Sequence, residues 1–155
     1  MGISRKNKIK IIRIIARLNI GGPAIHTILL SEGLDGDEFE TILVVGKPDQ
    51  LEGDMSDFAK SKNINIRYIP ELRREISLSD ITAFFKLFFI IRKIKPDIVH
   101  THTAKAGTLG RLAAILAGAP VKIHTFHGHI FHNYFSSIKT RFFIFIEKII
   151  GTFTD

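Results

Sequence analysis

Three of the seven histidines in this 155-residue chain stand close together in the stretch HTFHGH. They are His124, His127 and His129. An imidazole can bind a metal ion, move a proton near neutral pH or hydrogen-bond a hydroxyl or a phosphate. A zinc site needs three or four convergent ligands, whereas His124 and His127 point to opposite sides of an extended segment. We therefore expect no metal site, and His127, followed by Gly128, is the candidate catalytic residue.

A second histidine pair lies in the stretch HTHT, where His100 and His102 alternate with a threonine and so share one face of a strand. His102, nearer the end of that strand, is a candidate substrate contact. His100 is expected to be structural, because a buried imidazole needs only a hydrogen-bond partner for its polar nitrogens. Lys105 begins the next helix and could reach a phosphate, with a solvated lysine as the alternative.

Paired glycines, Gly21 and Gly22, precede Pro23 after the first predicted strand. Glycines permit positive φ and close approach of a ligand, and the free amides at a helix start attract anions. An ordinary tight turn is the alternative. No G-x-G-x-x-G fingerprint is present, and the second strand ends in Gly46 and Lys47 rather than an acid, so we expect no NAD or FAD and no other cofactor.

The composition favours an anionic partner, since 22 Lys and Arg against 15 Asp and Glu leave a formal charge of +7. No recognition motif supports nucleic acid as that partner. The absence of cysteine excludes disulfides and thiolate metal sites. The first apolar run contains Lys10, Arg13 and Arg17, which argues against a signal peptide, and no run reaches the roughly 18 apolar residues of a membrane span. We expect a cytoplasmic protein, with the inner face of the cell membrane as an alternative location.

The hydrophobic pattern alternates between short β-rich runs and longer helical ones, as in α/β proteins. It predicts strands over 8–16, 39–46, 64–69, 97–102 and 121–126, and helices over 23–34, 51–62, 79–95, 104–118 and 136–150. Ser77 or Ser79 should cap the third helix, which should stop before Pro96. Strands separated by helices pair in parallel through right-handed crossovers. We predict one three-layer Rossmann-like domain over residues 1–155, with a mainly parallel sheet in the order 3-2-1-4-5.

This strand order predicts where a ligand binds. In open parallel sheets the site lies at the carboxyl ends of the strands where the winding reverses, here between the first and fourth strands. The loop with Gly21 and Gly22, the loop with His102 and Lys105, and the stretch ending at His129 should therefore converge on one crevice.

Two kinds of helix face admit more than one interpretation. Small residues recur at helical spacing between 106 and 117, which we interpret as packing against the sheet, with a domain interface as the alternative. The segments 80–95 and 139–150 carry aromatic stripes with basic residues beside them. They are either core helices or surfaces that contact an anionic membrane.

The stretches RLNIGGPAIHT, DIVHTHTAKAGTLGRLAA and IHTFHGHIF together resemble the amino-terminal domain of GT-B glycosyltransferases of family 4. The resemblance implies a retaining enzyme that needs no metal and moves a sugar from a nucleotide diphosphate sugar to a glycan or lipid-linked acceptor. It also implies that this domain holds the acceptor, that Gly21 and Gly22 lie near the donor diphosphate, and that His127 contacts the donor sugar. Lys105 would contact the acceptor or a phosphate.

The chain departs from the family pattern in one large respect. We expect the carboxyl-terminal domain, which in the family binds most of the nucleotide and carries two glutamates in an E-x7-E arrangement, to be absent from this chain. We therefore expect this chain to be inactive by itself. The alternative function is a stand-alone, non-catalytic module that binds an anionic membrane or a protein partner.

Overall fold

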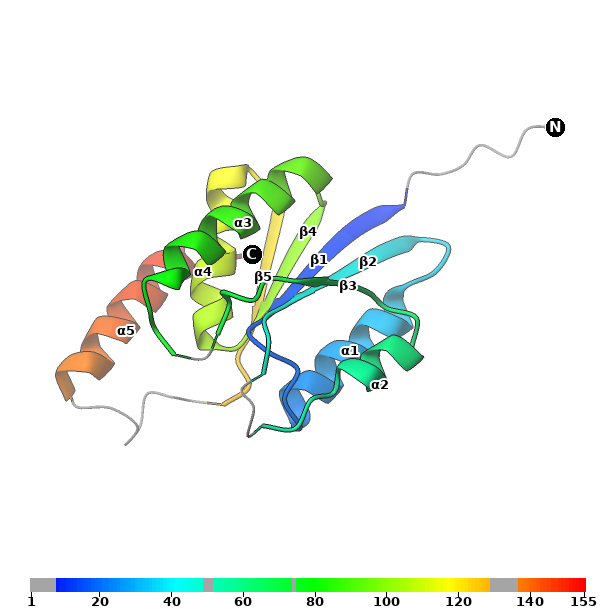
Figure 1. The fold of residues 1–155 in the computed structure, drawn as a ribbon. Coiled ribbons are helices and arrows are strands. Elements are labelled where there is room, and N and C mark those ends of the chain that lie inside the picture. The colour runs from blue at the N-terminus through cyan, green and yellow to red at the C-terminus, as the bar shows by residue number, and fades with distance from the viewer. Residues whose placement is uncertain (1–7, 49–51, 74, 129–136) are drawn as a thin grey trace.

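The fold is a five-stranded sheet with helices on both of its faces (Figure 1). The computed structural model describes residues 8–48, 52–73, 75–128 and 137–155. The strands are β1 (Ile9–Ile15), β2 (Phe39–Val45), β3 (Asn65–Tyr68), β4 (Ile98–His102) and β5 (Val121–Thr125). The helices are α1 (Gly22–Leu34), α2 (Ser56–Ser61), α3 (Ser79–Ile94), α4 (Ala104–Ala117) and α5 (Ser137–Gly151).

All the strand pairs are parallel, and their order is β3-β2-β1-β4-β5. The predicted α/β fold and strand order are therefore confirmed. On one face, Ile28 of α1 shares a hydrophobic cluster with Leu43 of β2 and with α2. On the other face, Leu87 of α3 and Ala113 of α4 share a second cluster with Ile14 of β1. Figure 1 shows the two helix layers on either side of the sheet.

The central strand β1 explains the isoleucine-rich start of the chain. Its residues from Ile11 to Ile15 are all buried, since β2 and β4 flank it and helices cover both faces. Parallel strands buried in this way are nearly continuous runs of branched apolar residues. Arg13 is the exception, in register with His100. Burial lowers the pKa of Arg13 to about 10, and its Nε and Nη1 have no hydrogen-bond partner among the described residues.

One face of α4 is nearly bare of side chains, which lets this helix lie close to β4 and β5. A Cβ added to Gly107 would stand 2.3 Å from Cε1 of His124. A Cβ added to Gly110 would stand 2.7 Å from Cγ2 of Thr101. Both glycines face the sheet, in agreement with the packing interpretation of this small-residue face.

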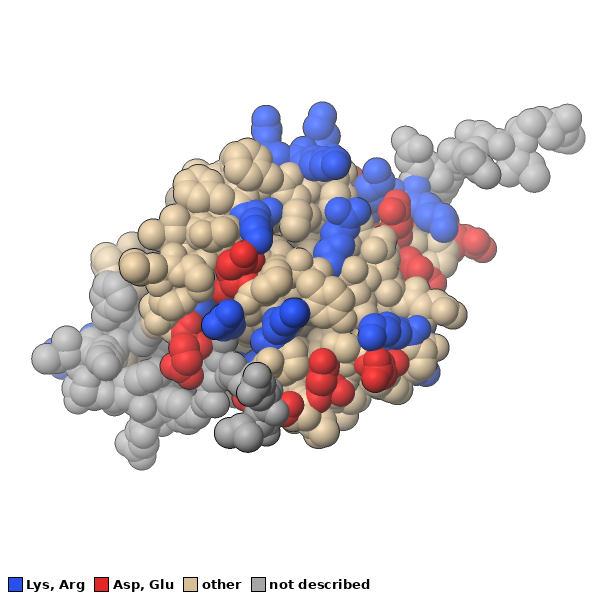
Figure 2. Space-filling model, viewed as in Figure 1, with Lys and Arg blue, Asp and Glu red and all other residues tan. Residues whose placement is uncertain are grey.

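The aromatic helix α3 divides between core and surface. Ala83, Leu87 and Ile91 are buried, whereas Phe85 and Phe89 are 51% and 64% exposed. Figure 2 shows Lys and Arg side chains gathered at the upper edge of the molecule, over the C-terminal end of α3, beside a largely uncharged surface. The core interpretation thus holds for one side of this helix only. Among the described residues, no helix is long and apolar enough to cross a membrane.

The second helix begins later than predicted. The sequence pattern indicated 51–62, but α2 starts at Ser56 because the chain before it is held extended. Asp54 pairs with Asn19 in an antiparallel bridge, and its carboxylate accepts the backbone N–H of Ser56 at 2.7 Å. The first residue of the predicted helix, at position 51, lies outside the described residues.

The predicted serine cap of the third helix is wrong. Leu78 occupies the N-cap position of α3 and makes no side-chain hydrogen bond there. The hydroxyls of Ser77 and Ser79 lie 2.7 Å apart and bond to each other. The carboxylate of Asp80 accepts the backbone N–H of Ser77 at 3.2 Å. This bond ties the first turn to the residue before the N-cap, and the helix dipole favours a carboxylate at that end.

An ion pair joins α5 to the rest of the domain. Arg111 of α4 is 1% exposed. Its Nη1 and Nη2 donate to the two carboxylate oxygens of Glu147 on α5 at 2.6 and 2.7 Å, and its Nε donates to the carbonyl of Gly107 at 3.0 Å. Bidentate pairs of this kind are strong and directional, so this one determines how α5 lies against α4.

We predict that Glu147→Ala lowers the free energy of unfolding by about 3 kcal/mol, because it leaves the buried Arg111 guanidinium without its partner. Urea unfolding followed by circular dichroism measures the change. Asp57→Ala is the control, since it breaks the solvent-exposed pair between Asp57 and Lys60 and should cause no resolvable change. Equal urea midpoints for Glu147→Ala and the unmodified chain would show that the pair does not hold α5.

Candidate functional site

Two of the predicted site residues meet at the carboxyl edge of the sheet. His102 is the last residue of β4 and is fully buried. His127 follows the end of β5. Nδ1 of His102 and Nε2 of His127 are 3.0 Å apart, a hydrogen-bond distance. The loops after β4 and β5 therefore converge, as the strand order predicted.

A third histidine, which the sequence analysis did not single out, lies beside this pair. His26 is an exposed residue in the first turns of α1, the helix that follows β1. Its ring centroid lies 5.8 Å from that of His102 and 5.3 Å from that of His127. One ring nitrogen from each of the three lies within 4.8 Å of the others. We call His26, His102 and His127 the histidine cluster. It joins the segments that follow β1, β4 and β5.

Two further histidines have structural partners outside the histidine cluster. Nε2 of His100 bonds to the hydroxyl of Thr125 at 2.8 Å, as expected of a structural histidine. Nδ1 of His124 bonds to the hydroxyl of Thr101 at 2.9 Å, on the sheet face that carries α4. His124 thus points away from the histidine cluster, as the alternation of an extended strand predicts. His129 lies outside the described residues.

Burial keeps this edge of the sheet uncharged. Loss of solvation, followed by the nearby His100, lowers the pKa of His102 to about 2. Loss of solvation, followed by Arg13, lowers the pKa of His100 to about 4. Burial, with His26 as the second cause, also lowers the pKa of His127. A neutral imidazole has one N–H donor and one lone pair, so these rings can bind a hydroxyl group or ligate a metal ion.

Two unusual backbone conformations adjoin the histidine cluster. Thr103, directly after His102, has φ 64° and ψ 159°, a region that β-branched residues rarely adopt. Its carbonyl accepts the N–H of Gly107 at 2.8 Å, which begins α4. Gly128, directly after His127, has φ 132°, which suits only glycine. Such conformations persist where the surrounding structure enforces them, so both histidines are followed by turns that the fold imposes.

The glycine pair before α1 is open, as predicted, although positive φ is not the reason. Gly21 is the N-cap, and its φ of 162° is an extended value that any residue adopts. Gly22 is also outside the left-handed region, so positive φ is not what these glycines provide. Within the described part of the chain, a Cβ added to Gly22 would meet nothing within 4 Å, and no side chain caps α1. The first amides of α1 therefore lie at an uncapped helix start.

The side chain of Lys105, another predicted site residue, points away from the histidine cluster. Its ammonium forms an ion pair with Asp80 of α3 at 2.5 Å, and it also donates to the backbone carbonyl of Glu75. The side chain is largely buried. Lys105 therefore reaches toward α3, which covers the sheet face opposite α1.

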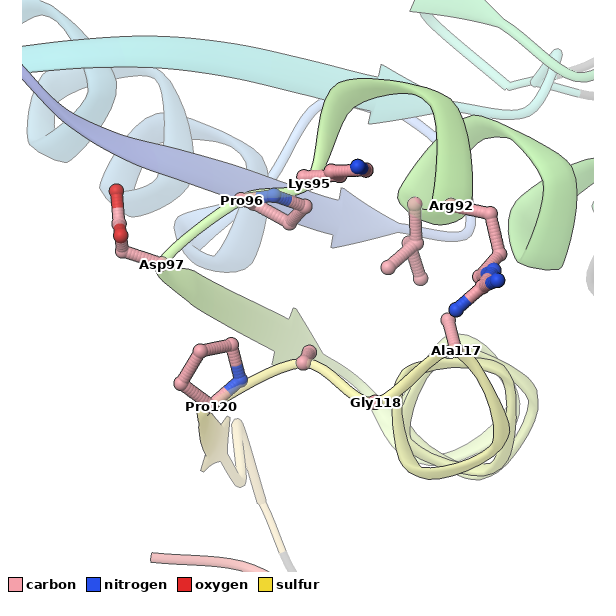
Figure 3. Close-up of a pocket in the computed structure, with 9 residues that line it drawn as sticks. Arg92, Lys95, Pro96, Asp97, Ala117, Gly118 and Pro120 are labelled. Atoms are coloured by element: carbon pink, nitrogen blue, oxygen red, sulfur yellow. The ribbon is translucent and has the colours of Figure 1, made fainter.

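A pocket of about 230 Å³ opens at the other end of the sheet, before the first residues of β4 and β5 (Figure 3). Arg92, Lys95 and Asp97 lie on one side of it and the turn at Gly118 on the other. The Asp97 carboxylate accepts the backbone N–H of Lys10 at 2.8 Å and so has a structural role. This pocket contains no histidine and lies at the opposite edge from the predicted site.

We predict that His124 makes folding stability depend on pH. Burial, followed by the charge of Arg111, lowers its pKa to about 4, against an ordinary value of 6.5. Between these values the unfolded chain binds the proton more readily, so stability falls as the pH decreases below about 6.5. At pH 5 the loss from this one group is at most about 2 kcal/mol.

The measurement is urea unfolding at pH 7, 6 and 5, with His124→Gln as the matched variant. Glutamine does not titrate, and its amide can still bond to the Thr101 hydroxyl. The variant should lose less stability than the unmodified chain between pH 7 and pH 5. Parallel pH profiles for the two proteins would contradict the prediction.

Comparison with known proteins identifies relatives of this chain. The family model described as Glycosyltransferase Family 4 matches residues 20–155. The UDP-Gal:alpha-D-GlcNAc-diphosphoundecaprenol alpha-1,3-galactosyltransferase of Escherichia coli is 34% identical over 131 residues, which cover 84% of this chain and 33% of that protein. The chain therefore spans about a third of the length of this relative.

Solved structures show the same fold at low sequence identity. MurG of Acinetobacter baumannii superposes with a TM-score of 0.65 at 16% identity, over 94% of this chain and 40% of that one. UDP-GlcNAc 2-epimerase of Neisseria meningitidis superposes with a TM-score of 0.56 at 13% identity, over 88% of this chain and 38% of that one. At such identities the likeness concerns the fold alone, and it is the match over residues 20–155 that decides the family. The chain belongs to glycosyltransferase family 4.

Proposed function

We propose that this domain is the acceptor-binding half of a retaining glycosyltransferase, which transfers a sugar from a nucleotide diphosphate sugar to a glycan or lipid-linked acceptor. A second domain that binds most of the nucleotide would complete the enzyme. The name of the E. coli relative specifies UDP-Gal and a GlcNAc linked to diphosphoundecaprenol. These names support a nucleotide sugar as donor and a lipid-linked glycan as acceptor for the present domain.

The observation that carries the proposal is the meeting of three segments at one edge of the sheet. His127 after β5 bonds to His102 at the end of β4, and the start of α1 lies beside both through His26. Open parallel sheets bind their ligands at this edge, where the winding direction reverses. A donor held there would touch residues from all three segments.

His127 suits a sugar hydroxyl better than a phosphate. Burial lowers its pKa, so the ring is neutral near pH 7 and adds no positive charge for an anion. Its Nε2 is shared with Nδ1 of His102, which leaves Nδ1 of His127 for a ligand. The shared bond makes the two tautomers complementary, so His127 Nδ1 presents one defined donor or acceptor to a hydroxyl.

The donor diphosphate would instead lie at the start of α1. Gly21 has no side chain to cap the helix, and Gly22 leaves open space where a Cβ would stand. Free amides and the helix dipole make such a helix start attractive to phosphate. We assign Gly21 and Gly22 to the diphosphate and His127 to the sugar, as the resemblance to the family implies.

His102 and Lys105 have smaller parts in this proposal. His102 is fully buried, so it acts by orienting His127 and contacts substrate only along the edge of its ring. Lys105 is paired with Asp80, and an acceptor phosphate would have to compete with that carboxylate. We keep Lys105 as an acceptor-side contact and expect its substitution to affect KM more than kcat.

We predict that His127→Ala, made in the complete two-domain enzyme, lowers kcat by about 100-fold, the cost of removing one hydrogen bond that stabilises a transition state. Folding stability should change by only about 1 kcal/mol, since one hydrogen bond to His102 is lost. Steady-state kinetics with a UDP-sugar and a lipid-linked acceptor measure the first effect, and urea unfolding measures the second.

His124→Gln is the matched control, because His124 also lies in the β5 segment but faces α4. Its turnover should remain close to that of the unmodified enzyme. A His127→Ala enzyme with near-normal turnover would contradict the role of His127. An active enzyme that inverts the anomeric configuration would contradict the retaining mechanism and leave the site assignment standing.

A second surface, on α3 and α5, supports contact with an anionic membrane. If the acceptor is lipid-linked, that membrane would be the inner face of the cell membrane. Phe85 and Phe89 stand on the exposed side of α3, and Phe145 on α5 is 61% exposed. Arg92 and Lys93 occupy the last turn of α3. An exposed apolar stripe with a basic rim is typical of helices that bind membrane surfaces. A non-catalytic membrane module would use the same surface, and the His127 experiment separates the two functions.

We predict that the chain sediments with vesicles that contain phosphatidylglycerol, more at about 50 mM than at about 500 mM NaCl, because salt screens the basic residues. The double variant Phe85→Ser, Phe89→Ser should lower the partition coefficient at least about 10-fold. The double variant Ile25→Ser, Leu29→Ser is the control, since it removes exposed apolar side chains from α1 on the other sheet face. Absence of vesicle binding at both salt concentrations would rule out the membrane surface.

A further inference from the structure

We propose that the histidine cluster, His26, His102 and His127, is a binding site for a divalent late transition-metal ion, zinc in the first place. The proposal departs from the expectation drawn from the sequence, which considered only histidines close together in the chain. It uses the same histidines as the transferase proposal, and an ion there would replace the bond between His102 and His127. Its test requires neither donor nor acceptor, so the two proposals can fail separately.

The spacing of the ring nitrogens is close to that of a metal site. Two nitrogens bound to one tetrahedral zinc stand about 3.3 Å apart, given Zn–N bonds of about 2.0–2.1 Å. Nδ1 of His102 and Nε2 of His127 are 3.0 Å apart, so these two need to separate only slightly. The ring that donates their hydrogen bond must move that proton to its other nitrogen, so that both facing nitrogens offer a lone pair. One nitrogen of each ring lies within 4.8 Å of the others. His26 therefore has to move by about 1.5 Å at most to complete the set.

Two of the three ligands are held in place, and the third is exposed and can adjust to an ion. His102 is fully buried at the end of β4, and His127 is held between β5 and the turn at Gly128. Ligands on strands and enforced turns are preorganised, which favours a metal site. His26 is exposed on α1, so its side chain is free to adjust when an ion arrives.

The donor set selects the kind of ion. Three imidazoles suit zinc, cobalt, nickel and copper, whereas magnesium and calcium require oxygen ligands. Three protein ligands leave one position of a tetrahedral ion open to water or to an oxygen of a bound ligand. The site should therefore bind Zn²⁺ and ignore Mg²⁺.

The test is calorimetric titration of ZnCl₂ into the purified 155-residue chain without a histidine tag. We expect one ion per chain, unaffected by excess MgCl₂, and affinity at least about 10-fold weaker in His26→Ala, a substitution on an exposed face of α1. The double variant His129→Ala, His132→Ala is the control for histidines outside the cluster and should bind as the unmodified chain does. Circular dichroism verifies that both variants fold.

A second measurement needs no variant. In a proton–nitrogen correlation spectrum of the histidine rings, Zn²⁺ should shift the signals of His26, His102 and His127 and leave that of His124 in place. The proposal is overturned if the unmodified chain binds no Zn²⁺, if binding is unchanged in His26→Ala, or if binding is lost with His129 and His132.

Discussion

The parallel pairing of β1 with β4 is the constraint on which the domain depends. The two strands lie side by side in register, yet the chain leaves them toward opposite faces of the sheet, to α1 and to α4. None of the described helices then covers the carboxyl ends of both strands. His102 at the end of β4 and the start of α1 are thereby placed at one edge, and β5 adds His127 from the next position in the sheet.

Side-chain alternation along β4 and β5 separates His124 from the histidine cluster. Thr101 and His124 face α4, where their hydrogen bond and the glycines of that helix form a tight contact. His102 and His127 face the side of α1 and meet at its first turns. A shift of one residue in either strand would exchange these roles, because neighbouring residues point to opposite faces.

Much of the fold and part of the site could be predicted from the sequence. Strand order followed from the alternation of β-rich and helical runs, and the meeting of His102 with His127 followed from their places at strand ends. His26 could not be found in this way, since its approach depends on the rotation of α1 about its axis. The extended start before α2 and the pairing of Lys105 with Asp80 each depend on a partner distant in the chain.

The sequence by itself determined the family, the order of the layers and the faces of the strands, because these follow from local periodicity and from motifs of adjacent residues. Only the tertiary structure decided which polar groups pair with each other. In the folded domain His26 lies beside His102 and His127, and Lys105 pairs with Asp80 of α3. Part of the aromatic face of α3 is buried, and Phe85 and Phe89 are exposed. Contacts between side chains depend on distances of a few ångströms across elements far apart in the chain, and no local pattern encodes those distances.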